Sequence, residues 1–425
     1  MKTKTKLLSF FLALTLIFSL PVLTSCQING GDTDNAKLEE TLKAYVDEKV
    51  REGGDTNNYD ITVTTDSSVS LLAASKGLLS AVSIYCDFTL EQSRGWGPNA
   101  STYEEHKQSA GAGVVYKLDK EKGNAYVITN YHVVYNAQAN TKNHISSDIN
   151  LYLYGKESTA YAIPATYIGG SMLYDIAVLK VEGSDVLRSS NVRAADFADS
   201  NDVSVLDTAI VIGNPEARGI SATVGHVNVP SEYIQMKAAD DLTVISMRVS
   251  RIDAAVNEGN SGGGLFNDEG NVIGIVNAKM SSSSIDNIGY AIPSNIAKYV
   301  ANNIIDYCDG KDNENVYRSL LGITVEVAAS DTVYDTETGR LHIVEQVAVK
   351  EIEEKSLAAG VMQEGDVIRS ITIGGETYEV TRTYHIVDIM LNARVGDTVT
   401  ISFTRGGTAG SASITITDSS LKKYN

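Results

Sequence analysis

The sequence predicts a mainly β protein, organised as a β-barrel or β-sandwich domain followed by a smaller domain of mixed α and β structure. Between residues 72 and 305, short runs rich in Val, Ile and Tyr recur, separated by Gly, Asn and Asp. Only Asn295–Ile305 has the pattern of a clear helix in this stretch. Many short strands with turn residues between them and few helices are typical of barrels and sandwiches. With 43% hydrophobic and 21% charged residues, the chain also has enough apolar side chains to bury real cores.

The predicted strands of the first domain, residues 72–305, are short β-rich runs bounded by turn residues. They are Val82–Tyr85, Gly113–Lys117, Ala125–Thr129, Ile149–Tyr154, Ile176–Val181, Ala209–Ile212, Val244–Val249 and Val272–Val276. A charged, turn-rich stretch at residues 306–317 predicts a linker. The second domain, residues 318–418, alternates strands with helical pieces. Its predicted strands are Ile323–Val327, His342–Val347, Val367–Ile373 and Thr398–Phe403, and its predicted helices are Ser356–Val361 and Tyr384–Ala393.

The first 25 residues have the pattern of an export signal. Three lysines precede the apolar run Leu7–Leu20, which is too short to span about 30 Å of hydrocarbon but fits a signal-peptide core. The run is followed, after Pro21, by Leu23-Thr24-Ser25-Cys26, which resembles a bacterial lipobox. That resemblance implies a lipid anchor on Cys26 and an extracytoplasmic protein held on a bacterial cell membrane. The alternative is an ordinary secretory signal with a chance cysteine. Residues 26–71 are polar and predict a tether with a short helix at Lys37–Arg51.

The charge and the metal-binding residue types exclude two classes of partner. The net charge of −18 repels phosphate backbones, and no basic run offsets it, so we expect no nucleic-acid partner. The three cysteines form no Cys-x-x-Cys pair, and the six histidines are scattered without HExxH spacing. We therefore expect neither a metal site nor a cofactor.

The residues with the clearest chemistry are a serine, a histidine and an aspartate. Ser261 stands in Gly259-Asn260-Ser261-Gly262-Gly263, a loop without bulk that exposes a hydroxyl and turns backbone N–H groups inward. A serine nucleophile needs a base and an acid that orients the base. His132 follows a β-type run, and Asp175 opens a buried strand. The order His, Asp, Ser matches chymotrypsin-type enzymes rather than α/β-hydrolases or subtilisins.

The motifs around these residues resemble the HtrA/DegP family of serine proteases. The matching segments are Thr129-Asn130-Tyr131-His132-Val133-Val134, Asp175–Lys180, Ile212–Pro215, Asp253–Ala255, Gly259–Gly263 and Ile288–Pro293. The resemblance implies a chymotrypsin-like double β-barrel, two six-stranded barrels with the catalytic residues between them, and assembly as a homotrimer. It makes His132 the general base, Asp175 the residue that orients it and Ser261 the nucleophile. The N–H groups of Gly259 and Ser261, with Asn260 between them, would form the oxyanion hole.

The chain departs from the family pattern beside the nucleophile. Glu258 and Gly264 stand where the family usually has prolines, and both changes loosen the backbone. In trypsin-like enzymes the residue six before the nucleophile forms the floor of the primary specificity pocket, and the resemblance implies that this residue is Ala255, which has no carboxylate. With Asn277 it predicts cleavage after small or medium apolar residues. Alternatively, the loop Asn277–Asp286 reshapes the pocket.

The second domain resembles an α/β PDZ domain of the HtrA kind. The resemblance lies in Leu321-Gly322-Ile323, Ser356–Val361 and Gly365–Ile368. It implies that backbone N–H groups at Leu321, Gly322 and Ile323 bind the carboxylate of C-terminal peptides, with the peptide added as a strand. The alternative is a domain that only packs against the protease. Together, the motifs predict a membrane-anchored, ATP-independent serine endopeptidase acting on misfolded or selected extracytoplasmic proteins. The alternative function is a catalytically dormant, peptide-binding or chaperone-like scaffold.

Overall fold

The structure, a computed structural model, describes residues 66–94, 101–280, 288–311, 315–336 and 338–424. Residues 66–425 belong to one compact unit. The predicted signal peptide, Cys26 and the predicted helix Lys37–Arg51 lie outside the described residues. The first described helix, α3 (Asp66–Leu78), begins inside the range predicted as tether and packs against the second barrel through β7 and β10.

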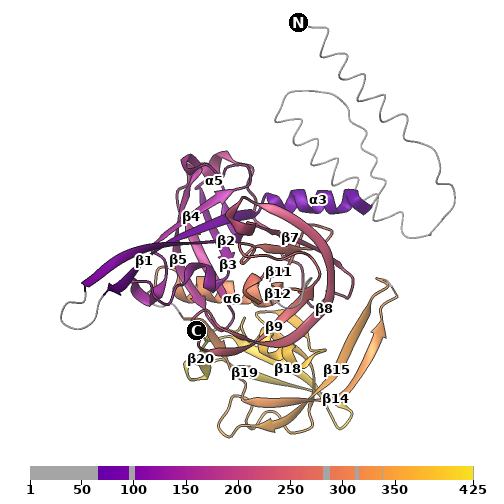
Figure 1. The fold of residues 1–425 in the computed structure, drawn as a ribbon. Helices are drawn as coiled ribbons and strands as arrows, with labels where there is room; N and C mark the ends of the chain where they lie inside the picture. The colour runs from indigo at the N-terminus through magenta and orange to yellow at the C-terminus, as the bar shows by residue number, and fades with distance from the viewer. Residues whose placement is uncertain (1–65, 95–100, 281–287, 312–314, 337, 425) are drawn as a thin grey trace, which may run out of the picture. The chain divides into compact units, whose positions relative to one another are not determined.

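The first domain consists of two closed six-stranded barrels (Figure 1), which confirms the predicted fold class. The first barrel has the strand order β1-β2-β3-β6-β5-β4, and all its neighbouring strands are antiparallel. Its strands are β1 (Ala81–Arg94), β2 (Ser101–Asp119), β3 (Asn124–Thr129), β4 (Asp148–Leu153), β5 (Ile163–Ser171) and β6 (Ile176–Val181). Its short helices are α4 (Tyr131–Val134), η2 (Lys142–His144), η3 (Thr159–Tyr161) and α5 (Asp185–Ser189). Alternate residues of β1, among them Val82, Ile84, Cys86 and Phe88, are buried in the barrel, as a strand's two-residue period requires.

The second barrel repeats this arrangement in the order β10-β11-β12-β9-β8-β7. Its strands are β7 (Thr208–Gly213), β8 (Ser221–Lys237), β9 (Val244–Ile252), β10 (Gly264–Phe266), β11 (Val272–Val276) and β12 (Gly289–Pro293), with the short helices η4 (Pro215–Ala217) and η5 (Ala278–Met280). Every residue of β11 is buried, which explains its continuous apolar run. Helix α6 (Ser294–Cys308) contacts β5 and β6 of the first barrel and β11 and β12 of the second. It therefore packs both barrels into one domain.

The C-terminal domain is built on one antiparallel sheet with the order β14-β15-β16-β18-β19, and β17 pairs with β16. Its elements are β14 (Ile323–Tyr334), β15 (Leu341–Ile352), β16 (Val367–Ile373), β17 (Glu376–Glu379), α7 (Thr383–Ile389), β18 (Thr398–Arg405) and β19 (Thr408–Thr415). The prediction of a helix at Ser356–Val361 was wrong, because this segment forms turns. Gly360 has a φ of +81°, and the Ala358 N–H donates to the Leu321 carbonyl, so neither residue takes part in a regular helix.

The predicted linker is packed rather than exposed over most of its described length. Helix α6 runs on to Cys308, and Val316 is fully buried. Strand β13 (Tyr317–Ser319) then pairs with β20 (Leu421–Lys423), which follows the short helix η6 (Asp418–Ser420) and lies beyond the predicted end of the domain. The seam between the domains has its own hydrogen bonds: Asn303 Nδ2 of α6 donates to the Tyr317 carbonyl at 2.6 Å and to the Leu391 carbonyl of the C-terminal domain at 3.3 Å. The two domains therefore share a packed interface.

Candidate active site

The loop that carries Ser261 depends on glycines. Gly259 and Gly262 have φ values of +93° and +83°, in the left-handed region that favours glycine. A Cβ at Gly259 would lie 2.1 Å from the Asn214 carbonyl oxygen, and one at Gly262 would lie 2.2 Å from the Ala112 carbonyl oxygen. The loop is further attached to the first barrel because the Ala112 N–H donates to the Ser261 carbonyl at 2.8 Å. The sequence thus fixes the serine between the two barrels.

His132, Asp175 and Ser261 form one hydrogen-bonded chain. His132 lies in α4, directly after β3, with Nε2 2.8 Å from Ser261 Oγ. Its Nδ1 is 2.7 Å from Asp175 Oδ2. The His132 side chain is 17% exposed and that of Asp175 only 4%. For Ser261 to donate its proton to Nε2, Nδ1 must carry the other ring proton and donate it to Asp175. The structure brings together the three residues that the sequence singled out.

Asp175 is held by hydrogen bonds from three residues, His132, Asn277 and Asn130. It lies in the turn between β5 and β6 with a φ of +48°, which is uncommon for a residue with a side chain. Its Oδ1 accepts from the His132 backbone N–H at 3.0 Å. Its Oδ2 accepts from Asn277 Nδ2 at 2.7 Å, and its carbonyl accepts from Asn130 Nδ2 at 2.9 Å. These bonds satisfy a buried carboxylate that would otherwise be costly.

Asn277 is a residue whose contact the sequence did not indicate. Besides the position in the specificity pocket that the sequence predicts for it, its fully buried side chain donates a hydrogen bond to Asp175. The two residues are 102 positions apart in the sequence, so no local pattern signals the contact. Ala255, the other predicted pocket residue, is exposed, and its carbonyl accepts from Thr223 Oγ1 at 2.9 Å. Residues 281–287 of the neighbouring loop lie outside the described residues.

The backbone beside Ser261 presents two N–H groups. Among the described residues, neither the Gly259 N–H nor the Ser261 N–H donates to a protein acceptor, whereas the Asn260 N–H donates to the Asn257 carbonyl at 3.0 Å. The Glu258 carbonyl accepts from the Glu216 N–H at 2.9 Å. Because the C=O and N–H of a trans peptide point in opposite directions, this bond directs the Gly259 N–H away from Glu216. The arrangement fits a pocket for a developing oxyanion.

The predicted carboxylate-binding turn of the C-terminal domain resembles the Ser261 loop in two respects: it contains a glycine with positive φ, and hydrogen bonds to its carbonyl groups orient its N–H groups. Gly322 has a φ of +71°, and a Cβ there would lie 2.1 Å from Ser356 Cβ. The Leu321 carbonyl accepts from the Ala358 N–H at 3.0 Å, and the Gly322 carbonyl accepts from the Glu353 N–H at 2.9 Å. These two bonds direct the N–H groups of Gly322 and Ile323 the opposite way. Strand β14, which begins at Ile323, is the edge strand of its sheet.

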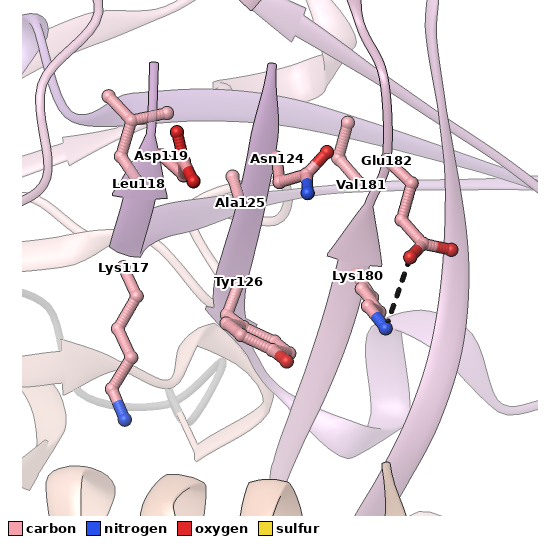
Figure 2. A pocket seen from close by; sticks show the side chains of 9 residues that line it. All are labelled: Lys117, Leu118, Asp119, Asn124, Ala125, Tyr126, Lys180, Val181 and Glu182. Carbon is pink, nitrogen blue, oxygen red and sulfur yellow. Dashed lines mark ion pairs between the residues drawn. The ribbon is translucent and has the colours of Figure 1, made fainter. Parts of the chain in front are cut away.

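A separate hollow of about 360 Å³ is lined by residues of three neighbouring strands of the first barrel. Figure 2 shows its lining from the ends of β2, β3 and β6: Lys117, Leu118, Asp119, Asn124, Ala125, Tyr126, Lys180, Val181 and Glu182. Lys180 pairs with Glu182 at 3.2 Å and with Asp309 at 3.1 Å, so its charge is already balanced. None of the lining residues belongs to the hydrogen-bonded chain of His132, and we do not assign a function to the hollow.

In the described part of the chain, no group of three or more His, Cys, Asp or Glu side chains is arranged to hold a metal ion. No helix in the same ranges has the length and apolar character needed to cross a membrane.

Comparisons with known proteins place this site in a family context. Residues 111–275 match the model of the trypsin-like peptidase domain. The serine protease Do-like HtrA of Bacillus subtilis is 30% identical over 315 residues, which cover 73% of this chain and 64% of that protein. The protein of the same description from Lactococcus lactis subsp. cremoris is 28% identical over 378 residues, covering 85% of each chain. A solved structure described as HtrA-type protease AlgW with decapeptide aligns with a TM-score of 0.48 and 23% identity, over 81% of this chain and 97% of that one. Residues 111–275 therefore form a trypsin-like peptidase domain, and the chain is similar in sequence to serine proteases of the HtrA type.

Proposed function

We propose that this homologue of the HtrA serine proteases is an ATP-independent serine endopeptidase that hydrolyses extracytoplasmic proteins through an acyl-enzyme. The observation that carries the proposal is the continuous chain of hydrogen bonds from Asp175 through His132 to Ser261, with distances of 2.7 and 2.8 Å. Nucleophile, base and orienting acid are all within the reach that general-base catalysis requires.

The reaction follows from this geometry. Ser261 Oγ attacks the carbonyl carbon of the scissile bond while His132 Nε2 takes its proton. Asp175 stabilises the imidazolium that forms. The N–H groups of Gly259 and Ser261 stabilise the negative charge that develops on the substrate oxygen. Removal of one such donor typically lowers kcat about 10²- to 10³-fold. His132 then gives the proton to the leaving amine, and water, deprotonated by the same histidine, hydrolyses the ester and frees Ser261.

The substrate class is an inference from the surroundings of Ser261 and from the second domain. Ala255 offers no carboxylate to a Lys or Arg side chain, so we expect cleavage after Val, Ala, Ile or Leu. The turn Leu321–Ile323 and the edge of β14 fit an extended peptide with a free C-terminal carboxylate. Such ends, when apolar, are exposed in misfolded proteins and hidden in folded ones. A peptide library with Arg or Lys dominant before the cut would contradict this substrate class.

The decisive experiment is labelling of the protein with a fluorophosphonate probe. We expect covalent labelling that Ser261→Ala abolishes, together with casein hydrolysis that disappears in the same variant. Ser261→Ala removes one oxygen, so its thermal midpoint should match that of the parent protein. A correctly folded parent that neither reacts with the probe nor cleaves casein would refute the proposal and favour a dormant peptide-binding scaffold.

The membrane anchor is a second part of the proposal and has its own test. Lipidation needs the thiol of Cys26, so Cys26→Ala should move the protein from the membrane fraction to the soluble fraction. Retention of the variant in the membrane fraction would overturn the anchor without affecting the assignment of an endopeptidase.

A further inference from the structure

The last described residues of the chain lie against the turn that carries Asp175. Strand β20 pairs with β13, and the Tyr424 N–H donates to the Val316 carbonyl at 2.8 Å. The Tyr424 carbonyl in turn accepts from Ser171 Oγ at 2.7 Å. Ser171 ends β5, four residues before Asp175. The tail segment, Leu421–Tyr424, is thus attached to the barrel at the base of the β5–β6 turn.

Arg318 forms a second connection between the tail segment and the β5–β6 turn. Its guanidinium carbon lies 3.9 Å from the centroid of the Tyr424 ring, and its Nη1 donates to Tyr174 Oη at 3.1 Å. Its Nη2 donates to Tyr424 Oη. Burial raises the pKa of Tyr174 to about 12, so this hydroxyl stays neutral and can accept the bond. Tyr174 directly precedes Asp175. The turn therefore contacts the tail segment at Ser171, where it begins, and Arg318 at Tyr174, near its end.

The conformation of Asp175 makes these attachments important. A residue with a side chain adopts a φ of +48° only when its surroundings impose it. Asn130 holds the Asp175 carbonyl from the side of β3. The residues that precede Asp175 are held by Arg318, Ser171 and the tail segment. The turn that sets the position of the Asp175 carboxylate is therefore held in part by the tail segment.

We infer that Tyr424 and Arg318 are positioning residues for Asp175, although they come from a part of the chain remote from the protease barrels in sequence. This inference rests on the proposed endopeptidase function. The tail segment acts on the orientation of the base rather than on substrate binding. Its loss should therefore lower kcat and leave the KM of a small peptide nearly unchanged.

The test compares Tyr424→Ala with two matched variants. Tyr424→Phe keeps the ring stacked on Arg318 and loses only the hydroxyl, and Lys423→Ala alters the exposed neighbouring side chain at the end of β20. With a chromogenic peptide too short to reach β14, we expect Tyr424→Ala to lower kcat about 10-fold or more, which corresponds to about 1.4 kcal/mol or more in the barrier. KM should change less than about twofold. Tyr424→Phe should recover most of the rate, and Lys423→Ala should equal the parent protein.

A second measurement does not depend on catalysis. The Nδ1 proton of His132, in a short hydrogen bond to a carboxylate, resonates far downfield in the proton NMR spectrum. Tyr424→Ala should weaken or shift this resonance in protein whose thermal unfolding shows it to be folded. An unchanged resonance and an unchanged kcat would overturn the inference, as would a loss of activity confined to KM. If the parent protein hydrolyses nothing but the resonance still responds to Tyr424→Ala, the proposed function fails and the positioning role stands.

Discussion

A buried ion pair joins the second barrel to the C-terminal domain, and its removal should have a large effect. Arg248 of β9 donates to Asp388 of α7, and their side chains are only 3% and 9% exposed. Arg248 also donates to Ser231 Oγ at 3.2 Å, and its guanidinium lies 4.1 Å from the centroid of the Tyr384 ring. Burial raises the pKa of Asp388 above its usual range, while Arg248 opposes that shift. The carboxylate therefore depends on the guanidinium to stay charged at this interface.

Arg248→Met leaves a buried carboxylate without its partner, which typically costs about 3–5 kcal/mol of unfolding free energy. This cost should be largest at neutral pH. The pKa of Asp388 is higher in the folded than in the unfolded state, so its ionised form opposes folding and its neutral form does not. As the pH falls through the raised pKa, the carboxyl takes up a proton and the penalty of Arg248→Met shrinks. Asp388→Asn instead strands a guanidinium that cannot lose its proton, so its penalty should not disappear in this way.

The assay is urea denaturation of the parent and the variants at pH 7 and at pH 5. The control is Arg251→Met on the same strand, because the ion pair of Arg251 with Glu232 is about one-third exposed and should contribute about 0–1 kcal/mol. The double variant Arg248→Met/Asp388→Leu should recover most of the stability. A penalty of less than about 1 kcal/mol for Arg248→Met at pH 7 would show that water reaches this interface and that the reasoning is wrong.

Two further predictions concern the active site, and a third concerns the carboxylate-binding turn of the C-terminal domain. Asn277→Leu removes a hydrogen bond to a charged group, and such a bond is worth about 1.5–3 kcal/mol. We therefore expect kcat/KM to fall about 10- to 150-fold. An unchanged kcat/KM would exclude a role of this amide. Gly259→Ala should lower kcat by about 10²-fold or more and also lower the thermal midpoint, because its Cβ collides with the Asn214 carbonyl, strains the backbone and displaces the oxyanion N–H. Gly322→Ala should weaken binding of a C-terminal peptide, measured by calorimetry, and leave hydrolysis of a short chromogenic peptide as it was.

The sequence predicted the elements whose apolar pattern is continuous. The strand predicted at Ile176–Val181 coincides with β6, in which five of the six residues are buried. By contrast, β5 escaped prediction because Pro164, Gly169 and Gly170 have the pattern of a turn. The glycines are there because the barrel packs against them: a Cβ at Gly169 would lie 2.9 Å from Cys308 Sγ of α6. Long β8 was missed because most of its residues are at least partly exposed and it offers no clean alternation.

The sequence predicted those residues of the candidate site that lie in short local motifs. Loops rich in glycine around Ser261 and the short motifs of His132 and Asp175 identify those residues without a structure. Their support is not local. Asn277 donates to Asp175 across 102 residues, and Ser171 donates to Tyr424 across 253. Contacts of this kind depend on how the two barrels and the C-terminal domain pack, which no window of sequence contains.

The two asparagines that contact Asp175 orient this residue at a cost in the free energy of folding. Asn130 and Asn277 each donate from Nδ2 to Asp175, while the Oδ1 atom of each is buried without a hydrogen-bond partner among the described residues. An unsatisfied buried oxygen costs about 1–3 kcal/mol, which an apolar side chain of similar size would avoid. Only a donor at these positions, however, can hold a buried carboxylate and its strained backbone in place. Asn277→Leu should therefore lower kcat/KM without lowering the free energy of unfolding, and a loss of stability equal to the loss of activity would show that the amide is structural rather than functional.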